Sequence, residues 1–173
     1  MKKYIRYAKP ISYEKEKRKR KKVKYIVIHN TGNYKDTAKN NADYFATGNM
    51  GEVGAHLFID RDGKIAKSIA LNRTAYSVEG GLFTSKNGAA SLFGVCTNYN
   101  SVSIELCDII DKPVSEKQLK ALIKTIKYVK RYCKNVKYIV RHWDVNGKDC
   151  PHYYKGVNNK EWEKLWKKLK TYI

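Results

Sequence analysis

No part of this chain contains the roughly 20 consecutive apolar residues that a membrane span requires. Residues 1–10 are basic but hold no continuous apolar segment, so they do not resemble a secretory signal. Cysteine is scarce, and Cys96, Cys107, Cys133 and Cys150 show no paired spacing such as C-x-x-C. A chain of 173 residues buries a sizeable core without disulfides, so we expect reduced thiols, synthesis in the cytoplasm and no membrane insertion.

Acidic residues are also few. The sequence has 16 Asp and Glu against 36 Lys and Arg, which gives a formal net charge of +20. This imbalance favours a polyanionic partner, either nucleic acid, an anionic membrane surface or an anionic cell-wall polymer. No recognition-helix or RNP-like signature is present, so we do not expect nucleic acid. Residues 14–22 form a charge block that is either a solvated lead-in or a contact for a polyanion.

The hydrophobic pattern mixes strands and helices. We expect a basic N-terminal lead-in over residues 1–23 and a single domain over residues 24–173, of the α/β class, with a central mixed β-sheet flanked by α-helices. Apolar, β-branched runs predict strands over residues 24–29, 53–60, 64–69, 101–107 and 136–140. Caps and apolar periodicity predict helices from Asp36 or Thr37 to Gly48, after a Ser115–Gln118 capping box, and over residues 160–172. The composition of residues 71–100 predicts a long irregular connection.

Two of the predicted strands end in a histidine, His29 and His142, and Cys150 follows the second at an interval of eight residues. Imidazole and thiolate are preferred zinc ligands, and three protein ligands leave a fourth position open, as in catalytic sites. Ligands at the C-terminal ends of strands lie where sites on α/β sheets collect. A lone histidine at a strand end is more often an ordinary hydrogen-bonded residue, so the spacing alone leaves both interpretations open.

Four further residues each allow two interpretations, one functional and one structural. Glu105 lies in an apolar strand and is either on a solvent face or a general base beside the metal. Lys148 is either a surface lysine or a group that stabilises an oxyanion. Asp144 is either a loop cap or an acceptor that orients His142. His56, between apolar residues, is either a buried core histidine or a reserve ligand.

The ordered set of motifs resembles the type 2 family of zinc-dependent N-acetylmuramoyl-L-alanine amidases, which includes phage endolysins, autolysins and peptidoglycan recognition proteins. The resemblance covers residues 24–155 and rests on four segments: Tyr25-Ile-Val-Ile-His29-Asn-Thr-Gly, Gly54-Ala-His56-Leu-Phe-Ile-Asp-Arg-Asp-Gly63, Asn100-Ser-Val-Ser-Ile-Glu105-Leu and His142-x-Asp-Val-x-x-x-Lys148-x-Cys150-Pro151. It implies a mixed sheet surrounded by helices, and one zinc ion held by the two histidines and the cysteine. It also implies that Glu105 and Lys148 are the catalytic pair.

The resemblance implies a bacteriolytic peptidoglycan hydrolase that cleaves the amide between N-acetylmuramic acid and L-alanine. We expect Asn30, Thr31, His56 and Tyr76 to contact the substrate. The expected setting is a monomeric phage or prophage endolysin released through a holin pore, with anionic wall polymers as a second partner for the basic surface. The alternative is a non-catalytic peptidoglycan-binding protein, but members of that kind commonly lose the cysteine that Cys150 supplies here.

Three departures from the family pattern concern the surroundings of the site. Ala55 stands where tyrosine is frequent, and Tyr76 and Ser77 stand where Trp and His are frequent. His152 follows Cys150-Pro151 where glycine is common, so we expect it near the metal. The change at Tyr76 and Ser77 concerns specificity for the stem peptide rather than the chemistry, whereas Ala55 removes any contribution from a tyrosine at that position.

Overall fold

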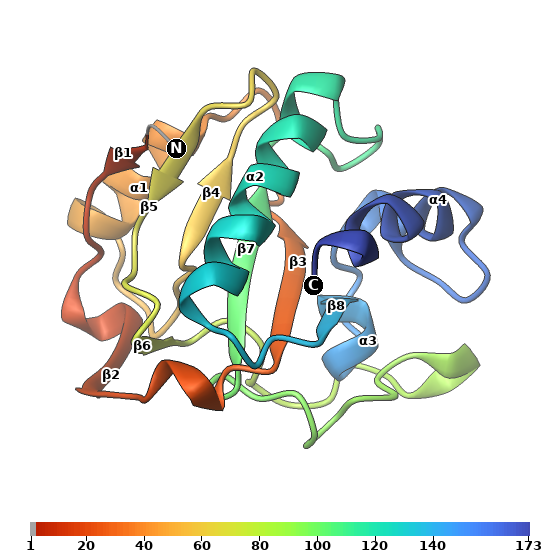
Figure 1. Cartoon of the computed structure of the whole chain (residues 1–173), viewed down its shortest axis with the longest axis horizontal. Helices are drawn as coiled ribbons and strands as arrows, with labels where there is room; N and C mark the ends of the chain where they lie inside the picture. The colour runs from red at the N-terminus through yellow and green to blue at the C-terminus, as the bar shows by residue number, and fades with distance from the viewer. Residues whose placement is uncertain (1–2) are drawn as a thin grey trace.

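A six-stranded mixed sheet forms the centre of the computed structural model, which describes residues 3–173 (Figure 1). Its strand order is β1-β5-β4-β7-β3-β8, and all neighbours are parallel except the antiparallel pair β4 and β5. This confirms the predicted class. The strands are β1 (Tyr4–Ile5), β3 (Tyr25–Asn30), β4 (Leu57–Ile59), β5 (Ile65–Lys67), β7 (Ser101–Leu106) and β8 (Tyr138–Arg141).

Helices cover both faces of this sheet, because alternate residues of its strands are apolar on either side. On β3, Ile26 and Ile28 join the core beneath α2 (Glu116–Tyr132) and α4 (Lys160–Leu169). Tyr25 and Val27 point to the other face, under residues of the 76–100 connection and α3 (His142–Asn146). The first helix, α1 (Ala38–Thr47), packs on that second face against β4 and β5. None of the helices described is both long and apolar enough to cross a bilayer.

Local signals place the helix boundaries well. Thr37 accepts a hydrogen bond from the backbone N–H of Asn40 at 3.1 Å, and Gly48 ends α1 as predicted. Ser115 likewise accepts from the backbone N–H of Gln118 at 3.0 Å. The Gln118 side chain, however, donates to the carbonyls of Ile59 and Cys107, both at 3.0 Å, and so links α2 to the sheet. The Gln118 half of the expected capping box is therefore replaced by a tertiary contact.

The N-terminal segment forms two strands that pair with later parts of the chain. Strand β1 extends the sheet beside β5, and β2 (Tyr13–Lys17) pairs antiparallel with β6 (Arg73–Ala75). Strand β6 lies inside the stretch expected to be irregular, so that expectation is wrong at this point. The remaining short elements are the 3-10 turns η1 (Pro10–Ser12), η2 (Arg20–Lys22), η3 (Lys86–Gly88), η4 (His152–Tyr154) and η5 (Lys170–Tyr172).

Arg18, in the middle of the charge block, is buried. Its guanidinium donates to the carbonyls of Asn98 and Tyr99 at 2.8 and 2.7 Å and to Leu71 at 3.4 Å. Burial lowers the pKa of Arg18 to about 10, which still leaves it charged at neutral pH. This residue of the block therefore holds the ends of the long connection in place, whereas most of its neighbours are exposed.

Candidate metal centre and catalytic cleft

Strand register brings the key side chains together at one end of the sheet. His29 on β3 is directly paired with Glu105 on β7, and the next neighbour, β8, delivers His142 as the first residue of α3. His29 and Glu105 lie on the face opposite α2, since their strand neighbours Ile28, Ile104 and Leu106 face the α2 core. The position agrees with the prediction of a site at the C-terminal ends of the strands.

His29, His142 and Cys150 form a compact triad. One ligand atom from each lies within 4.8 Å of the others, and the two imidazole centroids are 4.6 Å apart. Burial and nearby positive charge hold the pKa of His29 well below its ordinary value and lower the pKa of His142 to about 4. Both rings are therefore neutral, and the Nε2 atoms of both are buried without a hydrogen-bond partner. Unpartnered buried nitrogens beside a thiol are the donor set that zinc takes, so these residues fit the ion.

The thiol of Cys150 sits over the backbone that follows β3. The N–H of Asn30 donates to Sγ at 3.4 Å, and the carbonyl of Cys150 accepts from the N–H of Trp143 at 2.7 Å. Burial raises the pKa of the thiol, and the nearby Glu105 carboxylate adds to that rise. A metal ligand must be a thiolate, so metal binding here displaces a proton from Cys150.

The ring of His142 is oriented by a backbone group. It makes a hydrogen bond with the Val78 carbonyl, which leaves its Nε2 free to face the triad. Asp144 contacts other groups. It accepts from the backbone N–H of Arg141 at 2.7 Å and pairs with the Arg141 guanidinium at 2.6 Å. Asp144 therefore contacts Arg141 rather than orienting His142, and it acts as a cap at the start of α3, where the sequence suggested a loop cap.

Arg141 fixes the segment that carries two of the three triad residues. Its buried guanidinium also donates to the carbonyls of Tyr154 and Gly156 at 2.6 and 2.8 Å. It lies between two indole rings, 4.5 Å from that of Trp143 and 5.3 Å from that of Trp162. This network ties the start of α3 to the chain beyond Cys150, so His142 and Cys150 are held at a set separation.

Glu105 lies beside the triad, with its Oε1 3.9 Å from Nδ1 of His29 and its Oε2 without a hydrogen-bond partner. Burial raises the pKa of Glu105 to about 8, against the opposing effect of the Lys148 charge. A carboxyl group with a pKa near the working pH can both accept and return a proton. The side chain is 18% exposed, so it is open to the cleft.

Lys148 follows a turn that only glycine permits. Gly147 ends α3 at a φ of 80°, and a Cβ there would lie 1.9 Å from the Thr84 carbonyl oxygen. The turn puts the exposed Lys148 among the cleft-lining residues, where its charge lowers the pKa of both triad histidines and of Glu105. Its ammonium is thus close enough to act on negative charge that develops in the cleft.

The cleft over the triad has a volume of about 380 Å³, and a second hollow of about 480 Å³ adjoins it. The two share Thr31, Phe45 and Glu105 as walls, so they form one groove with Glu105 at its middle. Asn30 and Tyr76 also line the part over the triad. Three of the four residues expected to contact substrate therefore lie where a substrate can reach them.

His56 is the exception, because it is fully buried. The N–H of Ser103 donates to its Nδ1 at 3.1 Å, so its own proton is on Nε2 and donates to the Arg73 carbonyl at 3.1 Å. The guanidinium of Arg18 lies 3.0 Å from that Nε2. These contacts match the alternative of a buried core histidine, and they leave His56 no access to a substrate in the cleft.

This environment predicts acid sensitivity. Burial, with the Arg18 charge, lowers the pKa of His56 from 6.5 to about 3. The unfolded chain thus binds a proton that the folded chain does not, so the contribution of His56 to stability is fully present above pH 6.5 and is lost progressively towards pH 3. When the pH is lowered from 7 to about 4.5, the free energy of unfolding should fall in both proteins. We expect it to fall by about 2 kcal/mol less in His56→Gln than in the wild type. Urea unfolding in the presence of a chelator measures this.

The matched control is His152→Gln, which makes the same replacement at an exposed histidine outside the contacts of His56. Because each variant is compared with itself at the two pH values, a general loss of stability cancels. An equal loss in His56→Gln and the wild type would show that His56 is not the group responsible.

Two further residues make contacts that the sequence did not indicate. His152 donates its backbone N–H to the Asn30 side chain at 2.8 Å, while its exposed ring contacts the Ile110 carbonyl and Lys155. It is not part of the described triad. Asp36, considered only as a helix cap, lines the adjoining hollow and accepts from the Asn41 amide at 2.6 Å. Its position directly before the Thr37 cap was the sole sequence signal for it.

Comparison with known proteins decides the family. Residues 19–153 match the model of the family described as N-acetylmuramoyl-L-alanine amidase. The chain belongs to this amidase family. Its members are generally zinc-dependent, which agrees with the donor set of the triad.

A curated member of the amidase family, N-acetylmuramoyl-L-alanine amidase CwlA of Bacillus subtilis (strain 168), is 30% identical over 135 residues. The match covers 76% of this chain and 44% of CwlA, so the chain spans less than half the length of that relative. Among solved structures, PlyL superposes with a TM-score of 0.73 at 22% identity, covering 100% of this chain and 99% of PlyL. The amidase LysC from Clostridium intestinale URNW gives 0.63 at 22% identity, covering 97% and 98%. These structures share the amidase fold.

Proposed function

We propose that this chain is a zinc-dependent peptidoglycan hydrolase that cleaves the amide between the lactyl group of N-acetylmuramic acid and L-alanine. The observation that carries the proposal is the groove in which a buried His-His-Cys triad lies beside the Glu105 carboxylate, whose Oε2 has no hydrogen-bond partner, and beside Lys148. Membership of the amidase family supplies the reaction class.

His29, His142 and Cys150 would hold the zinc ion, which supplies Lewis-acid polarisation and a water of lowered pKa when it is bound. Glu105 accepts a proton from the attacking water and delivers it to the amide nitrogen as the C–N bond breaks. Lys148 stabilises the negative charge that develops on the carbonyl oxygen. Asn30, Thr31 and Tyr76, as walls of the groove, position the muramyl and peptide groups.

The remaining assignments extend this function. We place the chemistry in residues 24–173, while residues 4–23 brace the sheet and the long connection through β1, β2 and Arg18. We assign the protein to phage or prophage lysis, acting on the wall as a monomer after release through a holin pore. Its +20 charge supports anionic wall polymers as a second partner.

The test is the type of new chain ends released from purified peptidoglycan. We expect new N-terminal alanine without new reducing sugar ends, and we expect a chelator to stop the release. The rival function, recognition of peptidoglycan without catalysis, predicts tight binding to sacculi and no new ends of either kind. Release of reducing ends would instead identify a glycosidase and contradict the proposal.

A further inference from the structure

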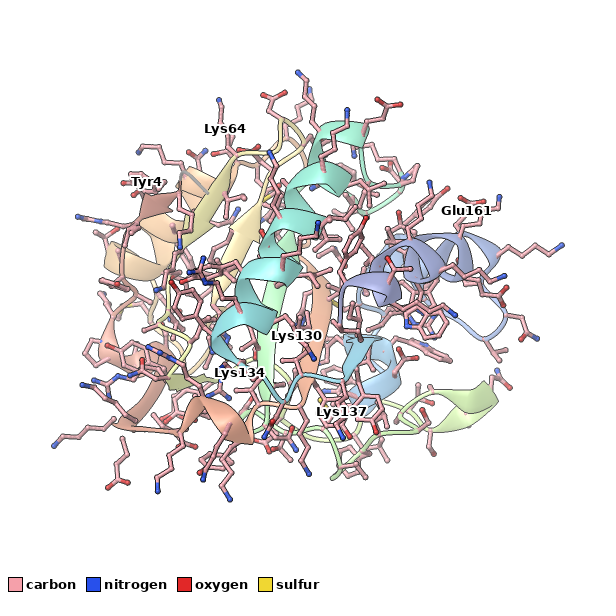
Figure 2. All side chains as sticks on the ribbon, in the orientation of Figure 1. Tyr4, Lys64, Lys130, Lys134, Lys137 and Glu161 are labelled. Carbon is pink, nitrogen blue, oxygen red and sulfur yellow. The ribbon has the colours of Figure 1, made fainter. Side chains whose placement is uncertain are left out.

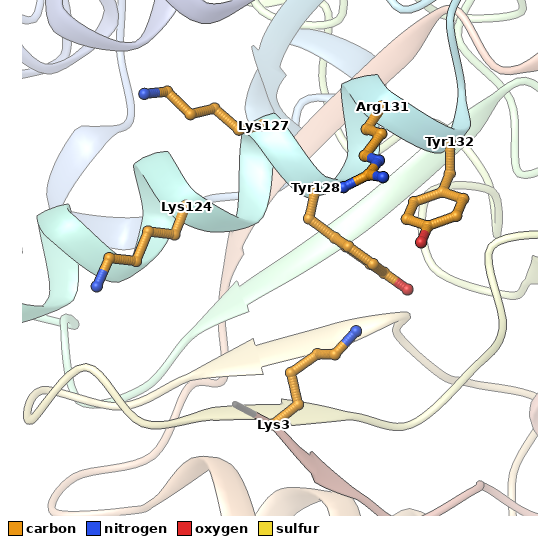
Figure 3. Close-up of a pocket in the computed structure, with 6 residues that line it drawn as sticks. All are labelled: Lys3, Lys124, Lys127, Tyr128, Arg131 and Tyr132. Carbon is orange, nitrogen blue, oxygen red and sulfur yellow. The ribbon is translucent and has the colours of Figure 1, made fainter. Parts of the chain in front are cut away.

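A depression of about 560 Å³ lies away from the catalytic groove, between α2 and the segment that leads into β1 (Figure 3). Its walls come from the C-terminal half of α2 and from the residue just before β1. Lys3 points across the depression toward the ring of Tyr128, and Tyr132 lies on the next turn of the helix. The walls are Lys3, Lys124, Lys127, Tyr128, Arg131 and Tyr132.

All the charged residues in the wall of this depression are positive. Four of its six wall residues are cationic and no wall residue carries a carboxylate. Within residues 3–173, no ion pair involves any of these four, whereas Lys117 on the same helix pairs with Asp62 and Lys164 on α4 pairs with Glu161. Lys134 and Lys137 continue the positive charge beyond the helix end (Figure 2). Uncompensated positive charge in a hollow attracts polyanions.

Tyrosine rings form the other part of the wall. The Lys3 ammonium is 3.7 Å from the Tyr128 ring centroid, and the Tyr128 and Tyr132 rings are 5.0 Å apart. Burial alone raises the pKa of Tyr128, but Lys3 and Lys67 together bring it below its ordinary value. The local positive potential is therefore strong enough to outweigh the effect of burial. The ring faces offer apolar area for a carbon backbone between charged groups.

The depression and the catalytic groove are on opposite faces of the sheet. Helix α2 packs on the face formed by Ile26 and Ile28, while His29 and Glu105 belong to the other face. A polymer held at α2 therefore leaves the groove open to peptidoglycan. Such an arrangement suits a tether that keeps an enzyme near its insoluble substrate, because the two ligands do not compete for space.

We propose that this pocket, lined by Lys3, Lys124, Lys127, Arg131, Tyr128 and Tyr132, binds a phosphodiester polymer of the bacterial wall, of the glycerol- or ribitol-phosphate kind. Phosphate groups pair with Lys3, Lys124 and Arg131, and the polyol segments lie on the tyrosine rings. The Lys127 ammonium lies 4.5 Å from the centroid of the Tyr172 ring and adds only to the general positive potential. A wall polymer fits better than nucleic acid because the groove on the opposite face acts on the wall. The inference thus depends on the proposed function for the identity of the polymer, but not for the presence of the pocket.

The experiment is a calorimetric titration of the whole chain with purified glycerol-phosphate polymer at about 0.05 M and about 0.15 M salt. We expect Lys124→Gln/Arg131→Gln to weaken binding about tenfold and to reduce the slope of affinity against salt by about 2. The control is Lys167→Gln/Lys168→Gln, which removes the same charge from exposed positions on α4 and should change affinity less than about twofold. Tyr128→Leu should weaken binding without changing the salt slope.

Equal weakening of binding by the two double variants would show that the polymer is held by diffuse electrostatic attraction to the whole surface. That result would overturn the proposal that it binds at this pocket. Equally tight, pocket-dependent binding of duplex DNA or of anionic lipid vesicles would overturn the assignment to a wall polymer. Hydrolysis of polymer-free sacculi is measured in parallel, and both double variants should keep wild-type rates because α2 is remote from the groove. If the wild type fails to hydrolyse these sacculi, the proposed function fails while the binding result is read independently.

Discussion

Replacing Glu105 with glutamine should lower the rate of amide hydrolysis by about 10²- to 10⁴-fold. Glutamine keeps the size and shape of the side chain between His29 and the cleft but cannot accept a proton. The register that pairs Glu105 with His29, and the unpartnered Oε2, identify this carboxylate as the group positioned to do so. The measurement is release of N-terminal alanine from sacculi, with zinc content determined on the same samples.

The matched control is Glu163→Gln, the same chemical change at an exposed position on α4. It should leave the rate unchanged. Glu105→Gln should still bind zinc, because Glu105 is outside the triad. If Glu105→Gln keeps more than about a tenth of the wild-type rate, another group takes the proton, and Asp36 in the adjoining hollow is the next carboxylate to test.

Replacing Cys150 with alanine should lower zinc affinity by at least about 100-fold and reduce hydrolysis to background. The triad loses its single anionic ligand, and two neutral imidazoles with unpartnered Nε2 atoms remain. The Asn30 N–H that donates to Sγ also loses its acceptor. Competition with a chromophoric chelator measures the affinity directly, without reference to activity.

Cys133→Ala provides the comparison, since it also removes a buried thiol but lies at the end of α2, outside the triad. It should bind zinc as the wild type does. Stoichiometric zinc in Cys150→Ala with wild-type affinity would show that the ion is held by other residues. Loss of zinc in both variants would point to the fold rather than to the ligand.

Much of the site follows from patterns that are local in the sequence. The apolar run that ends at His29 and the one that leads to His142 each form a strand, so the histidines must emerge at strand ends. The Thr37 and Ser115 caps set the starts of two helices because the cap acts within one turn. The motifs that carry the family resemblance include every member of the triad, together with Glu105 and Lys148.

Other roles depend on partners that are distant in the chain. The Gln118 amide bonds to the sheet instead of completing a capping box, because the packing of α2 brings it within 3.0 Å of the carbonyls of Ile59 and Cys107. Asp144 pairs with the charged guanidinium of Arg141 rather than with His142. His56 is enclosed by Arg18, Arg73 and Ser103, which come from three separate segments.

The sequence by itself determined most of the elements and the mixed α/β class, because caps and periodicity act over a few residues. Its motifs, through the family resemblance, also predicted the three residues that the fold brings together as a candidate metal centre. Tertiary structure alone decided that Arg18 is buried while the rest of its charge block is mostly exposed, that β6 pairs with β2, and that Lys3 joins the cations of α2 at one hollow. The physical reason is that burial and electrostatic potential depend on which segments pack together, and that packing is a property of the whole fold.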